Sequence, residues 1–444
     1  MLPPTGKSSM GRSVKSSEPL LQVGASLRSG PNNALGKDDG AAGNALSRKQ
    51  ALAGLALSLL VPSTGQVQKY LGNAGVAAYL VLASVAIVAA SRCISSRFPS
   101  QMSDRQAFWL AAFTWLGVVV IFILVYPLAK SGFVGGGTDR DAALNIATRE
   151  LLEGRYPYRL RTYLGNLITP LPGSLFLAVP FVLLGNSAYQ NLFWLPALFV
   201  AIAVYSRDAR SALLFLWALL ALSPAVWWEL VTGSDVLSNN IYVLIPMLAL
   251  VNSVPKLDLS RWKKALVAIL LGIALSSRPN FLFILPPLFS NMVQTVGWKE
   301  ATKYLGLTGA AWTAVTLPFY WHDPHSFSPL HVLSKLTEFQ SPLPAAAVVI
   351  PSVTLLVALG LSFQRMDAGG RVLLRNCAIA QAFPVFCIVV LSTIGTGRLE
   401  LSWTVYGTNF LFFGALAAWM TLVRSRQMGR ALREEVQIPS RREA

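Results

Sequence analysis

Charged residues are scarce in this chain. Only 13% of its 444 residues are Asp, Glu, Lys or Arg, whereas 54% are hydrophobic, and the mean hydropathy is +0.52. Soluble domains carry about 25% charged residues, so this composition excludes a soluble globular protein. It predicts an all-α, polytopic membrane helical bundle. In such a protein the net charge of +17 reflects basic cytoplasmic loops, and no nucleic-acid partner is expected.

Cysteine and histidine are also scarce. The cysteines Cys93, Cys377 and Cys387 lack the spacing of a metal site and imply no disulfide framework. All three histidines fall between Trp321 and Lys335. One interpretation of this cluster is a zinc site, and the other is hydrogen bonding or phosphate contact by loop histidines. The chain lacks an early apolar run, which predicts no cleavable secretory signal.

Twelve apolar runs are candidate membrane spans, since a helix of about 20 apolar residues crosses the hydrocarbon core. They cover residues 51–67, 73–90, 107–129, 189–205, 211–229, 240–254, 264–277, 280–296, 304–320, 343–363, 376–395 and 402–423. The run from Leu171 to Leu184 is too short to span and is predicted to be a partly embedded helix. Basic residues at both ends of 264–296 predict a hairpin there, with Arg278 and Pro279 at its tip.

Lysine and arginine predict the orientation of these spans. With the N-terminus inside and every span crossing, 27 of the 37 basic residues lie on the inner side. The outer side keeps 10, and six of those lie between Lys130 and Arg161. This alternation follows the positive-inside rule. The polar segments of the outer side are therefore the candidates for a functional surface.

The longest polar interval runs from Gly132 to Pro172. After the glycine run 135–137 come Thr138, Asp139 and Asp141, where a helix is expected to begin, because side-chain oxygens and negative charge suit the free N–H groups of a first turn.

Residues 142–153 have helical composition, and Gly154 is the expected stop. The aromatic turn Arg155-Tyr156-Pro157-Tyr158 follows. A carboxylate pair, a basic helix and an aromatic turn beside a membrane are typical of a catalytic loop. An ordinary polar connection between spans is the alternative.

The other outer segments also carry polar and ionisable residues. Such residues are costly at membrane depth and usually face a polar cavity. They are Glu229, Asp235, Asn239 and Asn240; Arg278 and Asn280; His322, Asp323, His325, His331, Lys335 and Glu338; and Arg398 and Glu400.

Together these features resemble the GT-C superfamily of membrane glycosyltransferases, in particular its polyprenol-phosphate-mannose-dependent branch. The resemblance rests on the multiple spans, the long first outer loop with Thr138-Asp139-Arg140-Asp141, the turn Gly154 to Tyr158, and Pro170-Leu171-Pro172. It covers residues 107–423. It implies a polyprenyl-phosphate sugar donor, a lipid or glycan acceptor, no cofactor, and an acidic general base in the first outer loop.

The resemblance also divides the chain into four regions. Residues 1–49 are predicted to be a disordered cytoplasmic tail, with a transit peptide as the alternative. Residues 50–106 form an N-terminal membrane hairpin and residues 107–423 a GT-C-like catalytic domain. Residues 424–444 form a basic cytoplasmic tail. The expected location is a bacterial inner (plasma) membrane, with the active site facing the periplasm or outside.

Two candidate acids leave two choices for the base. Residues 139 and 141 lie about 200° apart around a helix, so only one is expected to meet the acceptor, and we predict Asp139. Asp141 is then expected to cap the helix or pair with a neighbouring Arg. A divalent metal held by both carboxylates is the alternative.

The remaining site residues are predicted to bind substrate. Arg278, at the tip next to Pro279, is expected to bind the donor phosphate. Tyr156 and Tyr158 are expected to stack on a sugar. The alternative for the two tyrosines is an interfacial aromatic belt. At least one histidine is expected to face the cavity of Asp139. The full predicted set is Arg140, Tyr156, Tyr158, Asp235, Arg278, Asn280, His322, His325 and His331.

Two other functions compete with this interpretation. A transporter or flippase of lipid-linked sugars is expected to show internal repeats and charges at the middle of broken spans, and neither is visible in the sequence. A polymerase or ligase of lipid-linked glycans is expected to have a large late outer loop. The late segment from Trp321 to Pro342 is shorter than the early one.

Overall fold

Helices joined by turns make up the described chain, as its composition predicts. The computed structural model describes residues 36–94, 102–132, 138–256, 258–367 and 369–437. The helical bundle lies within one compact unit, Asn44–Ala444. Within the described part, the one β-type contact is an isolated antiparallel bridge between Arg161 and Leu167. The glycine run 135–137 and residues 1–35 of the predicted tail lie outside the described residues.

The N-terminal region is a helical hairpin, as predicted. Its elements are α1 (Gly36–Leu60), the 3₁₀ turn η1 (Val61–Ser63) and α2 (Thr64–Ile94). Gly72, with a φ of +64°, breaks α2. Arg48 Nη2 donates to the Ser91 carbonyl at 3.4 Å, so the two ends of the hairpin lie together. Helix α1 begins at Gly36, inside the segment 1–49 predicted to be a disordered tail.

Helix α4 (Asp104–Lys130) starts at a capping box. Ser103 Oγ accepts from the Gln106 amide, and Gln106 Oε1 accepts from the Ser103 amide at 2.8 Å. The elements that follow are α5 (Arg140–Leu152), α6 (Pro172–Leu183), η2 (Ser187–Tyr189), α7 (Gln190–Ser206), α8 (Ala209–Leu222) and α9 (Pro224–Val231). Helices α8 and α9 meet at 84°, because Pro224 favours the extended backbone seen at Ser223.

The next elements confirm the predicted hairpin at Arg278. They are α10 (Asp235–Ser253), α11 (Arg261–Leu275), η3 (Pro279–Ile284), α12 (Leu285–Val296) and α13 (Trp298–His322). Thr308 Oγ1 donates to the Ala268 carbonyl at 3.0 Å, and Thr316 Oγ1 lies 2.8 Å from Ser276 Oγ. Helices α11 and α13 therefore pack against each other and run in the same direction, and α12, which connects them in the sequence, packs against α13 and α15.

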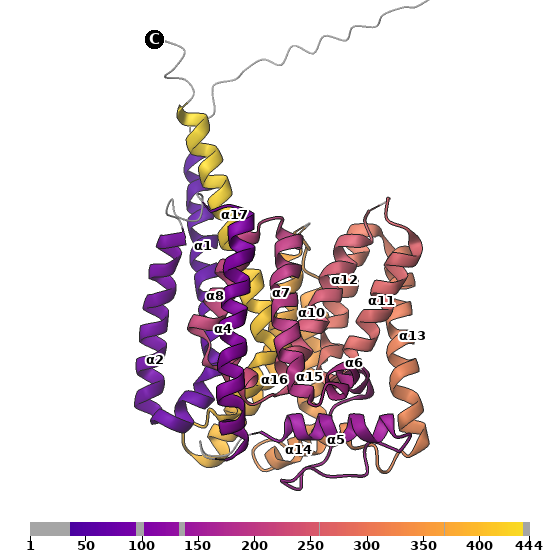
Figure 1. The fold of residues 1–444 in the computed structure, drawn as a ribbon. Helices are drawn as coiled ribbons and strands as arrows, with labels where there is room; N and C mark the ends of the chain where they lie inside the picture. Colours follow the sequence, from indigo (N-terminus) through magenta and orange to yellow (C-terminus); the bar gives the residue numbers. More distant parts are fainter. Residues whose placement is uncertain (1–35, 95–101, 133–137, 257, 368, 438–444) are drawn as a thin grey trace, which may run out of the picture. The chain divides into compact units, whose positions relative to one another are not determined.

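The last elements return the chain several times to the end of the bundle where α5 lies. They are η4 (Ser328–Leu330), α14 (His331–Lys335), η5 (Leu336–Phe339), α15 (Ala346–Ser362), α16 (Arg371–Thr396), η6 (Ser402–Gly407) and α17 (Thr408–Gln437). Figure 1 shows α5 and α14 across one end of the long helices, while α17 extends from the opposite end. The segments predicted to share the outer side meet at the α5 end.

The chain is a polytopic membrane helical protein. Six stretches of the described residues are long and apolar enough to cross a membrane, or seven if the bent pair α8–α9 is one span. The predicted number of about twelve spans is not confirmed. Helices α11, α12 and α15 have 15, 12 and 17 residues, and a helix rising 1.5 Å per residue needs about 20 to cross the core. Helix α6, with 12 residues, is too short to span, as predicted.

Candidate functional site

Helix α5 supports the candidate site. Its residues Ala143, Leu144 and Ala147 are buried on one side, in a cluster with Leu175 of α6. Gly154, with a φ of +71°, follows the helix end. The predicted helix and its glycine stop are confirmed, and the helix begins at Arg140 rather than near Thr138.

Asp141 is enclosed by bonded partners. Its side chain is 2% exposed, and Oδ1 lies 2.6 Å from Lys130 Nζ. Oδ2 accepts from the Tyr126 hydroxyl at 2.7 Å, which accepts from Asn186 Nδ2 at 2.7 Å. A carboxylate neutralised in this way, and lining none of the described cavities, is less suited than Asp139 to accept a proton. Asp141 does pair with a basic residue, but the partner is Lys130 and not the neighbouring arginine that was predicted.

Asp139 occupies the position before α5 and has neutral partners. Its Oδ2 accepts from the Thr162 hydroxyl and from Asn166 Nδ2, the latter at 2.8 Å. It makes no side-chain cap to α5, and within the described chain no cation lies at ion-pair distance. Neutral donors orient a carboxylate while leaving its charge uncompensated. The two acids face different partners, as their separation around the helix predicts.

Asp139 lines a cavity of about 530 Å³, which we call the first cavity. That volume lies in the range of sites for small ligands. Four predicted residues line it: Asp139, Arg140, Arg278 and Asn280. Apolar side chains of η3, α15 and α16 complete another part of its wall, including Phe283, Ile350, Val385 and Ile388. The first cavity therefore combines one carboxylate, fixed cations and an apolar surface.

Arg140 reaches the first cavity from a buried anchor. Its Nη1 lies 3.4 Å from Glu229 Oε1 and donates to Ser234 Oγ at 3.3 Å. Glu229 is completely buried, whereas the Arg140 side chain is 20% exposed. The Tyr406 ring lies 5.3 Å from the guanidinium carbon. These contacts hold the guanidinium in place and leave part of it open to the cavity.

Arg278 is held in a similar way. Its Nη2 donates to both carboxylate oxygens of Asp235, at 2.8 and 2.6 Å, and its Nη1 donates to Thr169 Oγ1 at 3.1 Å. Asp235 is completely buried and also accepts from Asn239 Nδ2 at 3.0 Å. Asp235 does not line the first cavity. The prediction that it contacts substrate is therefore corrected: Asp235 orients Arg278.

Asn280 lines the first cavity but is bonded to α16. Its Nδ2 donates to Gln381 Oε1 at 2.7 Å, and Gln381 Nε2 donates back to the Asn280 carbonyl at 2.8 Å. This reciprocal pair fixes the loop after Arg278 against α16.

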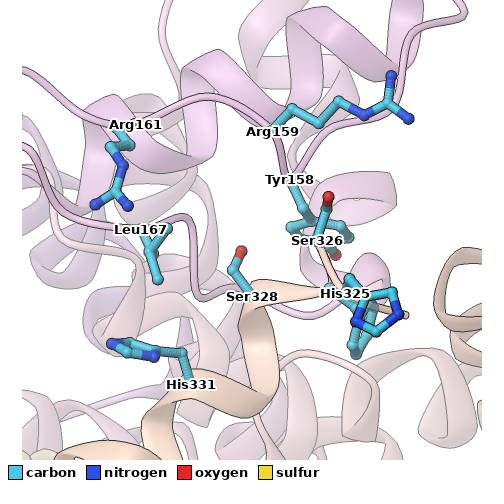
Figure 2. Close-up of a pocket in the computed structure, with 9 residues that line it drawn as sticks. Tyr158, Arg159, Arg161, Leu167, His325, Ser326, Ser328 and His331 are labelled. Carbon is cyan, nitrogen blue, oxygen red and sulfur yellow. The ribbon is translucent and has the colours of Figure 1, made fainter. Parts of the chain in front are cut away.

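The histidines do not share the first cavity. His325 and His331 line a separate cavity of about 400 Å³, which we call the second cavity, together with Tyr158, Arg159, Arg161, Leu167, Ser326, Phe327 and Ser328. Figure 2 shows the arginines on one chain segment and the histidines and serines on another, with the Arg161 side chain directed toward Leu167 and that of Arg159 directed away from the histidines. His322 lines neither cavity and lies against Tyr156, with ring centroids 5.1 Å apart. The prediction that a histidine faces the cavity of Asp139 is wrong, because the turn 161–167 separates the two spaces.

The aromatic turn stabilises the loop instead of lining the first cavity. The Tyr156 hydroxyl lies 3.0 Å from the carbonyl oxygens of both Phe319 and Asp323, to either of which its one proton can be donated, and burial raises its pKa to about 12. Tyr158 is 2% exposed, and its hydroxyl donates to the Pro170 carbonyl at 3.1 Å. Neither ring has a face open to a sugar beside Asp139, so the predicted stacking there is not supported.

Metal binding by the acid pair is not supported either. The described residues contain no group of three or more His, Cys, Asp or Glu side chains that could hold a metal ion. The carboxylate of Asp141 is already bonded to Lys130 and Tyr126.

Several lining residues of the first cavity were missed from the sequence. Thr162 and Asn166 hold Asp139, and Lys335, Trp403 and Tyr406 face the same space. Lys335 is one of few basic residues on the predicted outer side, and that signal could have identified it. No pattern in the sequence relates Thr162 and Asn166 to Asp139, because a fold-dependent turn brings them together.

The fold and the site define a polytopic membrane protein with a charged, part-apolar cavity at one end of its bundle. The chain matches no protein-family model, no curated protein and no solved structure.

Proposed function

We propose that the protein is a membrane glycosyltransferase of the GT-C type. It moves a sugar, mannose or another hexose or pentose, from a polyprenyl-phosphate donor to a lipid or glycan acceptor. The observation that carries the proposal is the first cavity, where Asp139 has no cationic partner among the described residues while two anchored arginines face the same space.

Asp139 is the general base of the proposed reaction. It takes the proton of the acceptor hydroxyl as that oxygen bonds to the anomeric carbon of the donor sugar. The bond between that carbon and the donor phosphate oxygen breaks, and its electrons leave with polyprenyl phosphate. Thr162 and Asn166 orient the carboxylate from one side. The phosphate is a good leaving group, so the reaction needs no strong acid and no cofactor.

Arg140, Arg278 and Lys335 stabilise the charge that develops on the departing phosphate. Buried acids hold both guanidiniums before the substrate arrives, so little reorganisation is required. A planar guanidinium can donate two parallel hydrogen bonds to a phosphate, which favours arginine at these positions.

The apolar part of the first cavity suits a lipid-linked donor. Ile350 of α15 and Val385 of α16 line it, while Val348 and Phe386 of the same helices are exposed apolar residues. Helices α15 and α16 thus have one side toward the cavity and another side suited to lipid. A prenyl chain could lie along them beside the site. The positive-inside pattern favours a bacterial inner membrane with this end facing the periplasm.

Transfer by the purified protein tests the proposal. Protein reconstituted in liposomes is incubated with radiolabelled polyprenyl-phosphate mannose and a membrane lipid extract as acceptor source. We expect label in a new glycolipid product for the wild type and loss of product for Asp139→Asn. Glu153→Gln is the matched control, since Glu153 is an exposed acid beyond the end of α5.

The same assay separates the competing functions. Movement of intact donor across the bilayer without product would identify a flippase. Products that lengthen with time on a glycan acceptor would identify a polymerase. Full transfer by Asp139→Asn would contradict the assignment of the base.

A further inference from the structure

The second cavity carries a different chemistry from the first. None of its described lining residues is acidic, and four of them are Arg159, Arg161, His325 and His331. Arginine can donate paired hydrogen bonds to phosphate oxygens, and both ring nitrogens of a protonated histidine are donors. The volume of about 400 Å³ admits a phosphate with an attached group.

Arg161 is the best placed donor. Its Nη1 donates to the Gly165 carbonyl at 2.9 Å, which orients the guanidinium and uses one of its five N–H groups. Arg161 forms no ion pair with the described residues. In Figure 2 its side chain extends toward Leu167, on the side of the cavity where His331 lies.

The histidines complete the set of donors. His331 Nδ1 lies 2.7 Å from Ser334 Oγ, so its ring is oriented and Nε2 remains for a ligand. His325 has no hydrogen-bond or ion-pair partner within the described chain. Arg159 contributes less, because its Nη2 lies 3.3 Å from Asp323 Oδ2.

The backbone explains why this site is separate from that of Asp139. Arg161 and Leu167 form an antiparallel bridge, and successive side chains of an extended segment point to opposite sides. Arg161 therefore lines the second cavity, while its neighbours Thr162 and Asn166 line the first and bind Asp139.

We propose that the second cavity binds a phosphate group through Arg161, His331 and His325. The group belongs either to a free phosphate or to an anionic lipid headgroup. The site requires no turnover and stands whether or not the protein transfers a sugar.

The test is a binding measurement on the full-length protein. In detergent, inorganic phosphate is titrated by calorimetry. In nanodiscs of phosphatidylcholine with and without phosphatidylglycerol, the lipids retained by the protein are measured by native mass spectrometry. Phosphate binding in the calorimetric titration without retention of phosphatidylglycerol identifies free phosphate as the ligand. Retention of phosphatidylglycerol without phosphate binding identifies a lipid headgroup.

Four variants locate the binding. Arg161→Gln and His331→Gln should each weaken it, Arg161→Gln by about 10- to 100-fold, the range for a hydrogen bond to a charged group. Arg155→Gln is the control, because Arg155 is an exposed arginine of the same loop that pairs with Glu150. Arg278→Gln reports on the first cavity.

Two results would overturn the proposal. One is no binding by the wild type in either arm. The other is binding that Arg278→Gln removes while Arg161→Gln and His331→Gln retain it. Circular dichroism and size-exclusion profiles matching the wild type establish that each variant is folded.

Discussion

The two cavities share the turn from Arg161 to Leu167, but their charged side chains are paired differently. In the first, each arginine is matched by a buried acid, and the free carboxylate of Asp139 is held by neutral groups. In the second, none of the described lining residues is acidic, and Arg161 is bonded to a carbonyl. In the proposed function, the first cavity moves a proton beside a fixed positive surface. The second is arranged only to hold an anion.

The largest effect is expected at Asp139. Asp139→Asn keeps the shape of the side chain and removes the proton acceptor, so the rate of sugar transfer should fall about 100- to 10,000-fold. The measurement is initial rates at matched protein amounts, with Glu153→Gln as the control. Activity within a few-fold of the wild type would move the chemistry out of the first cavity.

Asp141 should affect stability. Asp141→Asn leaves Lys130, whose side chain is 26% exposed, without its charge partner, which we expect to cost about 1 to 3 kcal/mol of unfolding free energy. Thermal unfolding in detergent measures this, and Asp139→Asn is the natural comparison because its carboxylate has no ion pair. A variant as stable as the wild type would show that the Lys130 contact contributes little.

Arg278 should set the affinity for the donor. Arg278→Lys keeps the charge but cannot donate to both Asp235 and Thr169 as the guanidinium does, so we expect about a tenfold higher KM for the donor. Arg161→Lys in the second cavity should leave that KM unchanged. Equal effects of the two substitutions would contradict the division of roles between the cavities.

The smallest effect is expected at Tyr156. Tyr156→Phe removes the hydroxyl whose proton is shared between two carbonyls at the end of α13, at a cost of about 1 kcal/mol. The unfolding temperature should drop while transfer below that temperature continues. Loss of transfer in a folded Tyr156→Phe protein would instead place Tyr156 at the substrate.

Local patterns allowed part of this structure to be predicted. The helix after Asp139, its stop at Gly154 and the turn at Pro279 depend on neighbouring residues, and all three are confirmed. The divergence of Asp139 and Asp141 follows from helix geometry alone. The grouping of polar segments at one end follows from the alternation of apolar runs.

Features that depend on distant contacts could not be predicted. Charge at the ends of apolar runs did not reveal that α11 and α12 are too short to span or that Pro224 bends the chain by 84°. Clustering in sequence suggested that the histidines join Asp139, whereas the turn 161–167 separates them. Asp235 was wrongly predicted to bind substrate, since its burial under Arg278 depends on the tertiary structure and is not visible in the sequence.

The bonds of Asp141 also determine how a large molecule reaches the first cavity. Helix α5 is tied to α4 through Lys130 and to η2 through Ser187, whose hydroxyl donates to the Asp141 carbonyl at 3.3 Å. The described side chains of α14, on another wall, hydrogen-bond only within residues 331–337. A bulky lipid-linked molecule should therefore be admitted by displacement of α14, and the rate of that opening would limit association without any movement of the base.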